Sequence, residues 1–427
     1  MIFSRLTRAK GTASTMALAI AVATGAMVSS VAFEAPAFAA KKKEKVAYSK
    51  AFIAAYQPLQ VLLQAEAPDA AAIKAALPPV LAAVENEDDR FATGQAYVAV
   101  SQKLNDLSLA LQGLELMLAS GKVPAENLGI YNFQAGQIAY KYEDYAKART
   151  YLQAALDVGY TENTPETFIA ESYFAEDRDA EGLNYLTGVI EARKAAGQPI
   201  DEAWIKRGLS IAYNAQMKAE AQKYAALYVR EFPGPTSWKD AIAILLNTGG
   251  YENPEILDLL RLGRRAGTLT DGRMYMEYVD AADYRRLPGE VVSVVEEGRT
   301  KGLLPSDDPY INDTYNQAAT RTKADQADMA SLMRDARAPN ATLRTVMAAA
   351  DSLLSLGRAA EAEEFYAKAS GIAGADTALV LTRLGIAQFD QGKLAEANAT
   401  FGKVTGIRQP IANLWLIYAD EKASGAM

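Results

Sequence analysis

The feature of this 427-residue sequence that most constrains its fold is a recurrence of small and large apolar residues every 34 to 35 positions. Ala350 in one unit occupies the place of Gly385 in the next, and Gly357 occupies the place of Gly392. Three further units lie upstream, each with a small residue at the equivalent place: Gly136, Ala170 and Gly208. A repeat of this length is typical of stacked helical hairpins.

The residue types within a unit explain why hairpins are expected. Small residues recur where two antiparallel helices must approach closely. Larger apolar residues follow the spacing of one helix face, as at Ala148, Leu152 and Ala155. Glycines such as Gly357 and Gly392 then end a helix and begin a turn. Because one hairpin cannot bury its own apolar face, neighbouring hairpins must stack.

These five units resemble the tetratricopeptide repeat (TPR), and the chain as a whole resembles an exported bacterial protein that contains such repeats. The unit that begins at Leu384 carries the resemblance best, with Gly385, Gly392, Ala397 and Phe401 at the family's small, turn, alanine and aromatic places. The resemblance covers a little under half of the chain. It implies an all-α fold, a right-handed α-solenoid of about nine to eleven stacked antiparallel helical hairpins. It also implies a scaffold that binds other proteins.

The remaining segments suggest an order of regions along the chain. Helical periodicity without clear repeats marks residues 40–125, where Pro78-Pro79 is expected to break one helix. The polar stretch 306–340 is expected to form a less regular helical pair, and it is either a joint between two blocks or part of one continuous solenoid. The predicted regions are a signal peptide (1–39), an N-terminal helical region (40–125), TPR-like repeats (126–235), divergent helical repeats (236–340), C-terminal TPR repeats (341–408) and a capping helix (409–427).

The N-terminus has the layout of a secretory signal peptide. Arg5, Arg8 and Lys10 precede an uncharged stretch over 15–33, and Ala37-Phe38-Ala39 then supplies a small-x-small cleavage site. We therefore expect an exported, periplasmic protein that begins at Ala40, with no stable membrane span after cleavage. The alternative is an uncleaved segment that anchors the chain in the membrane.

Composition narrows the function. The chain has no histidine and no cysteine, so the commonest general base, thiolate nucleophiles and the usual zinc ligands are missing. Its net charge of −8 disfavours nucleic acid as a partner. The acidic cluster at 85–89 is interpreted as a solvated loop or helix start, with a cation site as the alternative, and the lysine run at 41–45 as a solvated leader. We predict no catalytic residue, cofactor or metal site, and hence a protein that is not an enzyme.

Four aromatic residues at equivalent places in four units are the candidate partner-binding residues. They lie eight residues before the alanine or glycine of the second helix: Tyr140, Phe174, Tyr213 and Phe389. In proteins that this chain resembles, that place faces the concave groove or its edge, so the hypothesis is a groove that binds a protein partner. The alternative is that these residues only pack between repeats. A second possible function is binding of envelope polysaccharide or another glycan through exposed aromatic side chains.

Overall fold

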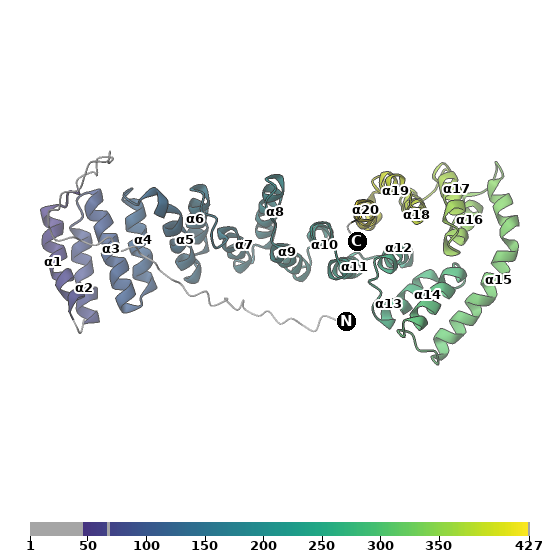
Figure 1. The fold of residues 1–427 in the computed structure, drawn as a ribbon, viewed down its shortest axis with the longest axis horizontal. Coiled ribbons are helices and arrows are strands. Elements are labelled where there is room, and N and C mark those ends of the chain that lie inside the picture. Colours follow the sequence, from purple (N-terminus) through teal and green to yellow (C-terminus); the bar gives the residue numbers. More distant parts are fainter. Residues whose placement is uncertain (1–45, 66–68, 426–427) are drawn as a thin grey trace. The chain divides into compact units, whose positions relative to one another are not determined.

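The structure is a computed structural model that describes residues 46–65 and 69–425. Within these ranges the chain is entirely helical, with twenty α-helices, one short 3₁₀ helix and no strand (Figure 1). The fold is therefore an all-α solenoid of antiparallel hairpins, as the repeat predicted. The chain divides into two compact units, Met1–Asp177 and Arg178–Met427, and each is described by itself.

The first unit contains seven described helices, in which each helix packs against the next. They are α1 (Lys50–Gln64), α2 (Ala70–Ala82), α3 (Glu87–Leu104), α4 (Leu107–Ala119), α5 (Ala125–Lys141), α6 (Tyr145–Asp157) and α7 (Pro165–Ala175).

The second unit contains thirteen α-helices, and its last helix packs against earlier ones as well as against its neighbour. They are α8 (Asp179–Ala195), α9 (Glu202–Asn214), α10 (Lys218–Glu231), α11 (Pro235–Thr248), α12 (Asn253–Arg265), α13 (Gly272–Ala282), α14 (Pro288–Thr300), α15 (Pro309–Arg337), α16 (Leu343–Ser355), α17 (Ala359–Ser370), α18 (Thr377–Asp390), α19 (Leu394–Phe401) and α20 (Gln409–Ser424), with η1 (Gly406–Arg408) before α20.

The acidic cluster at 85–89 forms the start of α3, as its composition suggested. The Asn86 side chain accepts a hydrogen bond from the Asp89 backbone N–H and caps the helix. Asp89 is fully buried, and its carboxylate accepts hydrogen bonds from the backbone N–H groups of Ser49 and Glu85. Its charge therefore ties the chain before α1 to the start of α3.

The glycines of the repeat lie where two helices of a hairpin meet. A Cβ atom on Gly385 would lie 2.4 Å from Phe401 Cε1, and one on Gly208 would lie 2.1 Å from Tyr224 Cε1. Gly136 meets the second helix of its own hairpin in the same way. The expected close approach of paired helices is therefore confirmed at these positions. The predicted turn residues Gly357 and Gly392 follow α16 and α18, with φ of 71° and 75°.

The expectation of a helical pair over 306–340 is wrong, because this stretch forms the single 29-residue helix α15. Its buried residues lie towards its two ends, from Ile311 to Ala318 and from Met329 to Ala336. Between these ends the helix buries no side chain, and it contains no glycine and no proline after Pro309. The polar composition thus reflects an exposed middle that links α14 and α16, and nothing in it breaks the helix.

The expectation that Pro78-Pro79 breaks a helix is also wrong. Both prolines lie inside α2, which continues to Ala82. The N–H groups missing at the two prolines would have bonded to the carbonyl oxygens of Lys74 and Ala75, so α2 lacks these two backbone hydrogen bonds and still continues to Ala82.

The predicted signal peptide, residues 1–39, lies outside the described residues, as does the lysine run at 41–45. Among the residues that are described, no helix is both long enough and apolar enough to cross a membrane.

Candidate functional site

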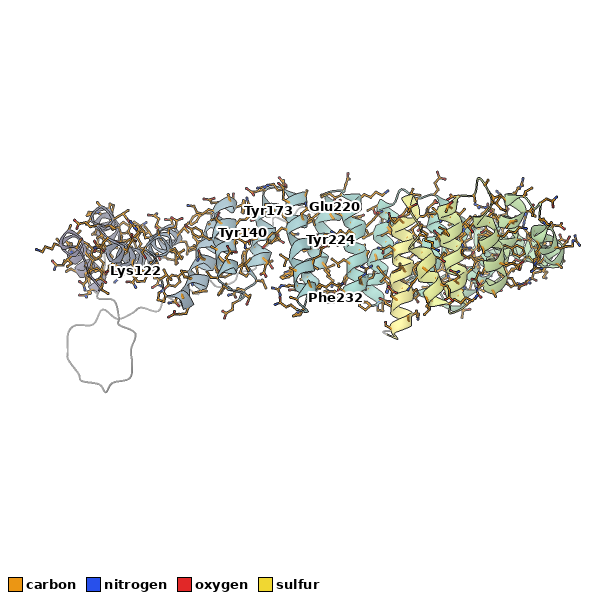
Figure 2. The ribbon with its side chains drawn as sticks, turned by 90° about the horizontal axis from the view of Figure 1, so that it is seen from above. Lys122, Tyr140, Tyr173, Glu220, Tyr224 and Phe232 are labelled. Atoms are coloured by element: carbon orange, nitrogen blue, oxygen red, sulfur yellow. The ribbon has the colours of Figure 1, made fainter. Side chains whose placement is uncertain are left out.

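In the first unit, the predicted groove residues Tyr140 and Phe174 take part in packing between helices. Tyr140 of α5 is half-buried (Figure 2), and its ring meets those of Tyr145 and Phe168 edge to face at 5.3 and 5.9 Å. Phe174 of α7 is buried, with 8% of its surface exposed. Tyr140 therefore keeps part of its surface accessible, whereas Phe174 exposes little.

In the second unit, the predicted groove residues Tyr213 and Phe389 lie in different surroundings. Tyr213 is half-buried near the end of α9. Phe389 of α18 packs against Trp415 and Tyr418 of α20, with both ring centroids 5.5 Å away. The chain's own last helix thus covers this side of Phe389. For all four aromatic residues, contact with a partner stays a prediction.

Helix α20 is attached to helices much earlier in the sequence. Trp415 Nε1 donates to the Asp258 carbonyl oxygen at 3.0 Å, and the Tyr418 hydroxyl donates to the Arg265 carbonyl oxygen at 2.5 Å. Trp238 Nε1 of α11 donates to the Glu421 carboxylate at 2.9 Å. Helix α20 therefore packs against α10, α12, α18 and α19, and it is hydrogen-bonded to α11.

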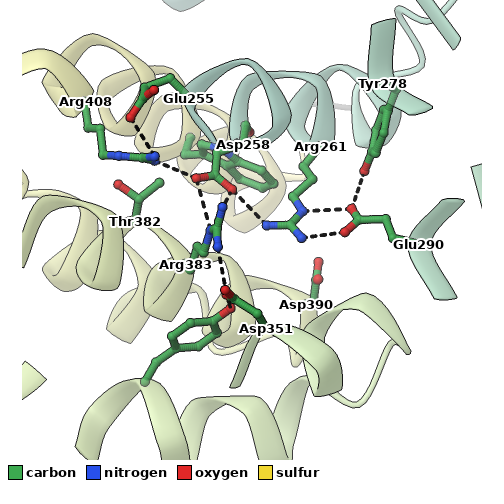
Figure 3. Close-up of polar contacts among 12 residues, drawn as sticks. Glu255, Asp258, Arg261, Tyr278, Glu290, Asp351, Thr382, Arg383, Asp390 and Arg408 are labelled. Atoms are coloured by element: carbon green, nitrogen blue, oxygen red, sulfur yellow. Dashed lines mark hydrogen bonds and ion pairs between the residues drawn. The ribbon is translucent and has the colours of Figure 1, made fainter. Parts of the chain in front are cut away.

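A buried cluster of charged side chains lies next to the contact between α20 and α12 (Figure 3). Asp258 of α12 is fully buried, and its carboxylate accepts hydrogen bonds from three arginines. Arg261 Nη1 lies 2.8 Å from Oδ1, Arg408 Nη1 lies 2.6 Å from Oδ2, and Arg383 Nε lies 3.3 Å from Oδ1. All three arginines are themselves about 1% exposed.

Each arginine has a second carboxylate partner, which balances the excess of positive charge around Asp258. Arg261 forms two hydrogen bonds to Glu290, at 2.8 and 2.5 Å. Arg383 Nη1 lies 2.8 Å from Asp351 Oδ1, and Arg408 Nη2 lies 2.8 Å from Glu255 Oε1. We call these seven residues the Asp258 cluster.

Two carboxylates of the Asp258 cluster, Asp258 and Glu290, are held in the ionised form. Burial alone would raise the pKa of Asp258, but the charges of Arg383, Arg261 and Arg408 outweigh it and keep that pKa below its ordinary value. Burial also works against an ionised Glu290, yet Arg261 keeps its pKa lowered. The cluster therefore holds α12, α14, α16 and α18 together. Near neutral pH, Asp258 and Glu290 carry no proton to donate.

A groove on the same unit lies between α8 and α10 on one side and the α19–α20 segment on the other. It has a volume of about 690 Å³ and we call it the α8–α20 groove. Its apolar lining comes from all sides: Ile190, Ala226, Leu227, Phe401, Val404, Pro410 and Leu416. Lys194, Lys223 and Arg230 line it together with Glu191, so its charge is predominantly positive.

Two polar groups in the α8–α20 groove are not satisfied by the described part of the protein. The Gln222 Nε2 group is buried and has no hydrogen-bond partner there. Such a donor costs free energy unless a ligand or water accepts from it. Arg230 is exposed and, within the same part of the chain, forms no ion pair. By contrast, Lys194 pairs with Glu231. The groove thus combines an apolar lining with available donors.

Sequence reasoning did not identify the Asp258 cluster or the α8–α20 groove. Asp258 is 125 residues from Arg383 and 150 residues from Arg408, and charged residues carry no period that could relate them. The apolar stripe at the C-terminus indicated a helix, but it did not indicate which side of that helix remains accessible at Leu416.

Comparison with known proteins adds a likeness in architecture. No protein-family model matches the chain, and no curated protein matches it. Among solved structures, 73 chains match. Three of them, all with low sequence identity to this chain, are described next. They are the Naa15/Naa10 complex bound to HypK-THB (14% identity, TM-score 0.37), the TPR domain of P58(IPK) (13%, 0.23) and the APC/C hetero-tetramer Cut9–Hcn1 (12%, 0.20).

In each of these three comparisons 88% of this chain is aligned. The aligned part spans 60% of the first protein's chain, 99% of the second and 85% of the third. At these identities and TM-scores, the likeness assigns no partner and no activity to this chain.

Proposed function

We propose that this protein is a non-catalytic scaffold of the cell envelope that binds a segment of a partner protein in the α8–α20 groove. The observation that carries the proposal is the groove itself, about 690 Å³ of accessible volume with an apolar lining and the unsatisfied Gln222 Nε2 donor. Clefts with an apolar lining and a few polar groups are the usual form of a binding site.

The chemistry of the groove defines the segment that fits it. An apolar side chain would bury its surface against Leu227 and Leu416. A backbone carbonyl or a carboxylate would accept a hydrogen bond from Gln222, and an acidic side chain would pair with Arg230. The expected partner segment is therefore apolar with at least one acidic residue.

The state of the buried carboxylates supports the non-catalytic part of the proposal. The pKa values of Asp258 and Glu290 are lowered because arginines surround them, whereas a general acid near neutral pH needs a raised pKa. The Asp258 cluster is thus engaged in holding helices together.

The location in the envelope rests on the predicted signal peptide. Cleavage after Ala39 predicts a mature protein that begins at Ala40. N-terminal sequencing of the protein recovered from the periplasmic fraction tests this directly. A full-length chain recovered from the membrane fraction would instead support the anchored form.

The described exposed aromatic residues favour a protein partner over a glycan. Tyr48, Tyr142 and Tyr310 are the exposed aromatic residues, at 38, 52 and 57%. They lie before α1, after α5 and at the start of α15, and are far apart in the sequence. A glycan platform requires several aromatic faces together.

Site-specific photo-crosslinking tests the groove. A photoreactive amino acid replaces Leu416, which lines the groove, or Lys422, an exposed residue of the same helix outside it. We expect one protein to crosslink from position 416 and not from 422. The crosslink should disappear when Leu227→Glu places a charge in the groove while circular dichroism shows unchanged helix content.

Equal crosslinking from both positions, or a crosslink that survives Leu227→Glu, would refute binding in this groove. The predicted aromatic residues are tested separately with the double variant Tyr140→Ala, Tyr213→Ala. A partner lost from a still-helical double variant would place these residues at the interface, and a partner retained would leave them as packing residues.

A further inference from the structure

A second hollow of opposite charge lies elsewhere on the same unit. It is formed by α12, α13, the segment after α14 and the start of α15, and has a volume of about 820 Å³. Its floor is apolar and is made by Ile256, Met276 and Leu303, which are all half-buried. When another apolar side chain covers partly exposed apolar side chains in a hollow, the burial of their surface is favourable.

The rim of this hollow is acidic. Asp271, Glu277, Asp280 and Asp308 line it against the single cation Arg273. Asp271 and Asp308 each use Oδ1 to cap a helix, and the other oxygen of Asp271 lies 4.0 Å from Arg273. Their carboxylates are therefore partly engaged.

Glu277 and Asp280 are less engaged than the two capping residues. Within the described part of the protein, neither forms an ion pair, and Asp280 accepts only a hydrogen bond from Tyr310. Burial and the nearby charges of Asp271 and Asp280 raise the pKa of Glu277, which shows that like charges crowd this place. A cation between Glu277 and Asp280 would relieve that repulsion.

Tyr310 supplies an aromatic face beside Asp280. Its hydroxyl donates to Asp280 Oδ1 at 2.9 Å, and 57% of its surface is exposed. An aromatic ring held next to a carboxylate can bind a lysine or arginine through its face as well as through the ion pair. No group of carboxylates among the described residues is arranged to hold a metal ion.

We propose that this acidic hollow docks a cationic, apolar segment of a second partner protein. A lysine or arginine of that segment lies between Glu277 and Asp280, and a neighbouring apolar side chain covers Met276. Charge complementarity identifies the occupant, because the rim carries four acids against one arginine. The proposal goes beyond the α8–α20 groove, whose lining is mainly basic, and makes the second unit an adaptor for two segments of opposite charge.

The test measures binding of a fluorescein-labelled synthetic peptide of alternating lysine and leucine to the mature chain by fluorescence anisotropy. Two control peptides replace every lysine by glutamate or every leucine by serine. We expect the lysine–leucine peptide to bind best, and its affinity to fall as salt rises. Equal binding of the lysine–serine peptide would mean that general charge attraction is responsible and would overturn the proposal.

The variant Glu277→Gln, Asp280→Asn should weaken binding of this peptide by about tenfold, because two exposed ion pairs are lost. The matched control Glu162→Gln, Asp328→Asn removes the same charge at exposed acids outside the hollow. The proposal is wrong if both variants weaken binding equally or if neither does.

The two docking sites can fail independently. Leu227→Glu in the α8–α20 groove should leave the affinity of the lysine–leucine peptide unchanged, and Glu277→Gln, Asp280→Asn should leave crosslinking from position 416 unchanged. Loss of crosslinking alone would reject only the proposed function, and loss of the peptide's selectivity for the hollow would reject only this inference.

Discussion

Replacing Asp258 by asparagine tests whether the Asp258 cluster holds the second unit together. Asparagine has nearly the same shape but removes the negative charge that Arg261, Arg383 and Arg408 share. The three guanidinium groups remain buried at about 1% exposure, and each loses a charged acceptor, since a neutral amide cannot accept as many or as strong hydrogen bonds. We therefore expect a large loss in the free energy of unfolding.

The expected loss is about 3 kcal/mol, the lower end of the 3–5 kcal/mol that breaking a buried ion pair costs. The lower end applies because each arginine keeps another carboxylate, as Arg383 keeps Asp351 at 2.8 Å. Asp390→Asn is the control. Asp390 pairs with Arg265, but the two side chains are 23 and 26% exposed, so its loss should cost only about 1 kcal/mol.

The assay is urea unfolding followed by tryptophan fluorescence. The three tryptophans of the chain, Trp204, Trp238 and Trp415, all lie in the second unit, so their emission reports on that unit alone. With a slope of about 2 kcal/mol per molar urea, Asp258→Asn should lower the midpoint by about 1.5 M. Equal midpoint shifts for Asp258→Asn and Asp390→Asn would refute the structural role of the cluster.

Four further perturbations follow from the same structure. Gly385→Ala should destabilise the second unit by about 1–3 kcal/mol, because its Cβ would lie 2.4 Å from a ring carbon. Gly188→Ala should stabilise α8 by about 0.5–1 kcal/mol, because the space around Gly188 is open. If Gly385→Ala and Gly188→Ala shift the melting temperature in the same direction, this reasoning is wrong. Because the folded-state pKa values of Asp258 and Glu290 are lowered, their stabilisation is complete above about pH 5, the ordinary carboxylate range, and is lost progressively as the pH falls towards their lowered folded-state pKa values. Urea midpoints from pH 7 to 3 measure this, and an equally steep fall in Asp258→Asn would argue against it. Removing residues 409–427 should expose α11 and shift the remaining tryptophan emission to longer wavelength, and an unchanged spectrum would show that α20 is dispensable.

The helical hairpins could be predicted because their cause is local. A helix face repeats every few residues, and the hairpin repeats every 34 to 35, so both are written in short stretches of sequence. The contact of Gly385 with Phe401 shows this, since both belong to one unit of the repeat. The prediction of a helical pair over 306–340 was wrong, because polar composition indicates that a segment is exposed but does not by itself indicate a turn.

What the sequence by itself determined is the fold class, the close helix contacts at the repeat glycines and the turns after α16 and α18. What only the tertiary structure decided is which surfaces meet and which stay accessible. The three arginines around Asp258 come from three elements up to 150 residues away, and α20 covers Phe389 while Leu416 stays in an open groove. The physical reason is that the two helices of a hairpin pack against each other through residues close in the sequence, as Gly385 and Phe401 do. The closure of the last helices onto α11 and α12 depends instead on the summed rotation of every hairpin between them.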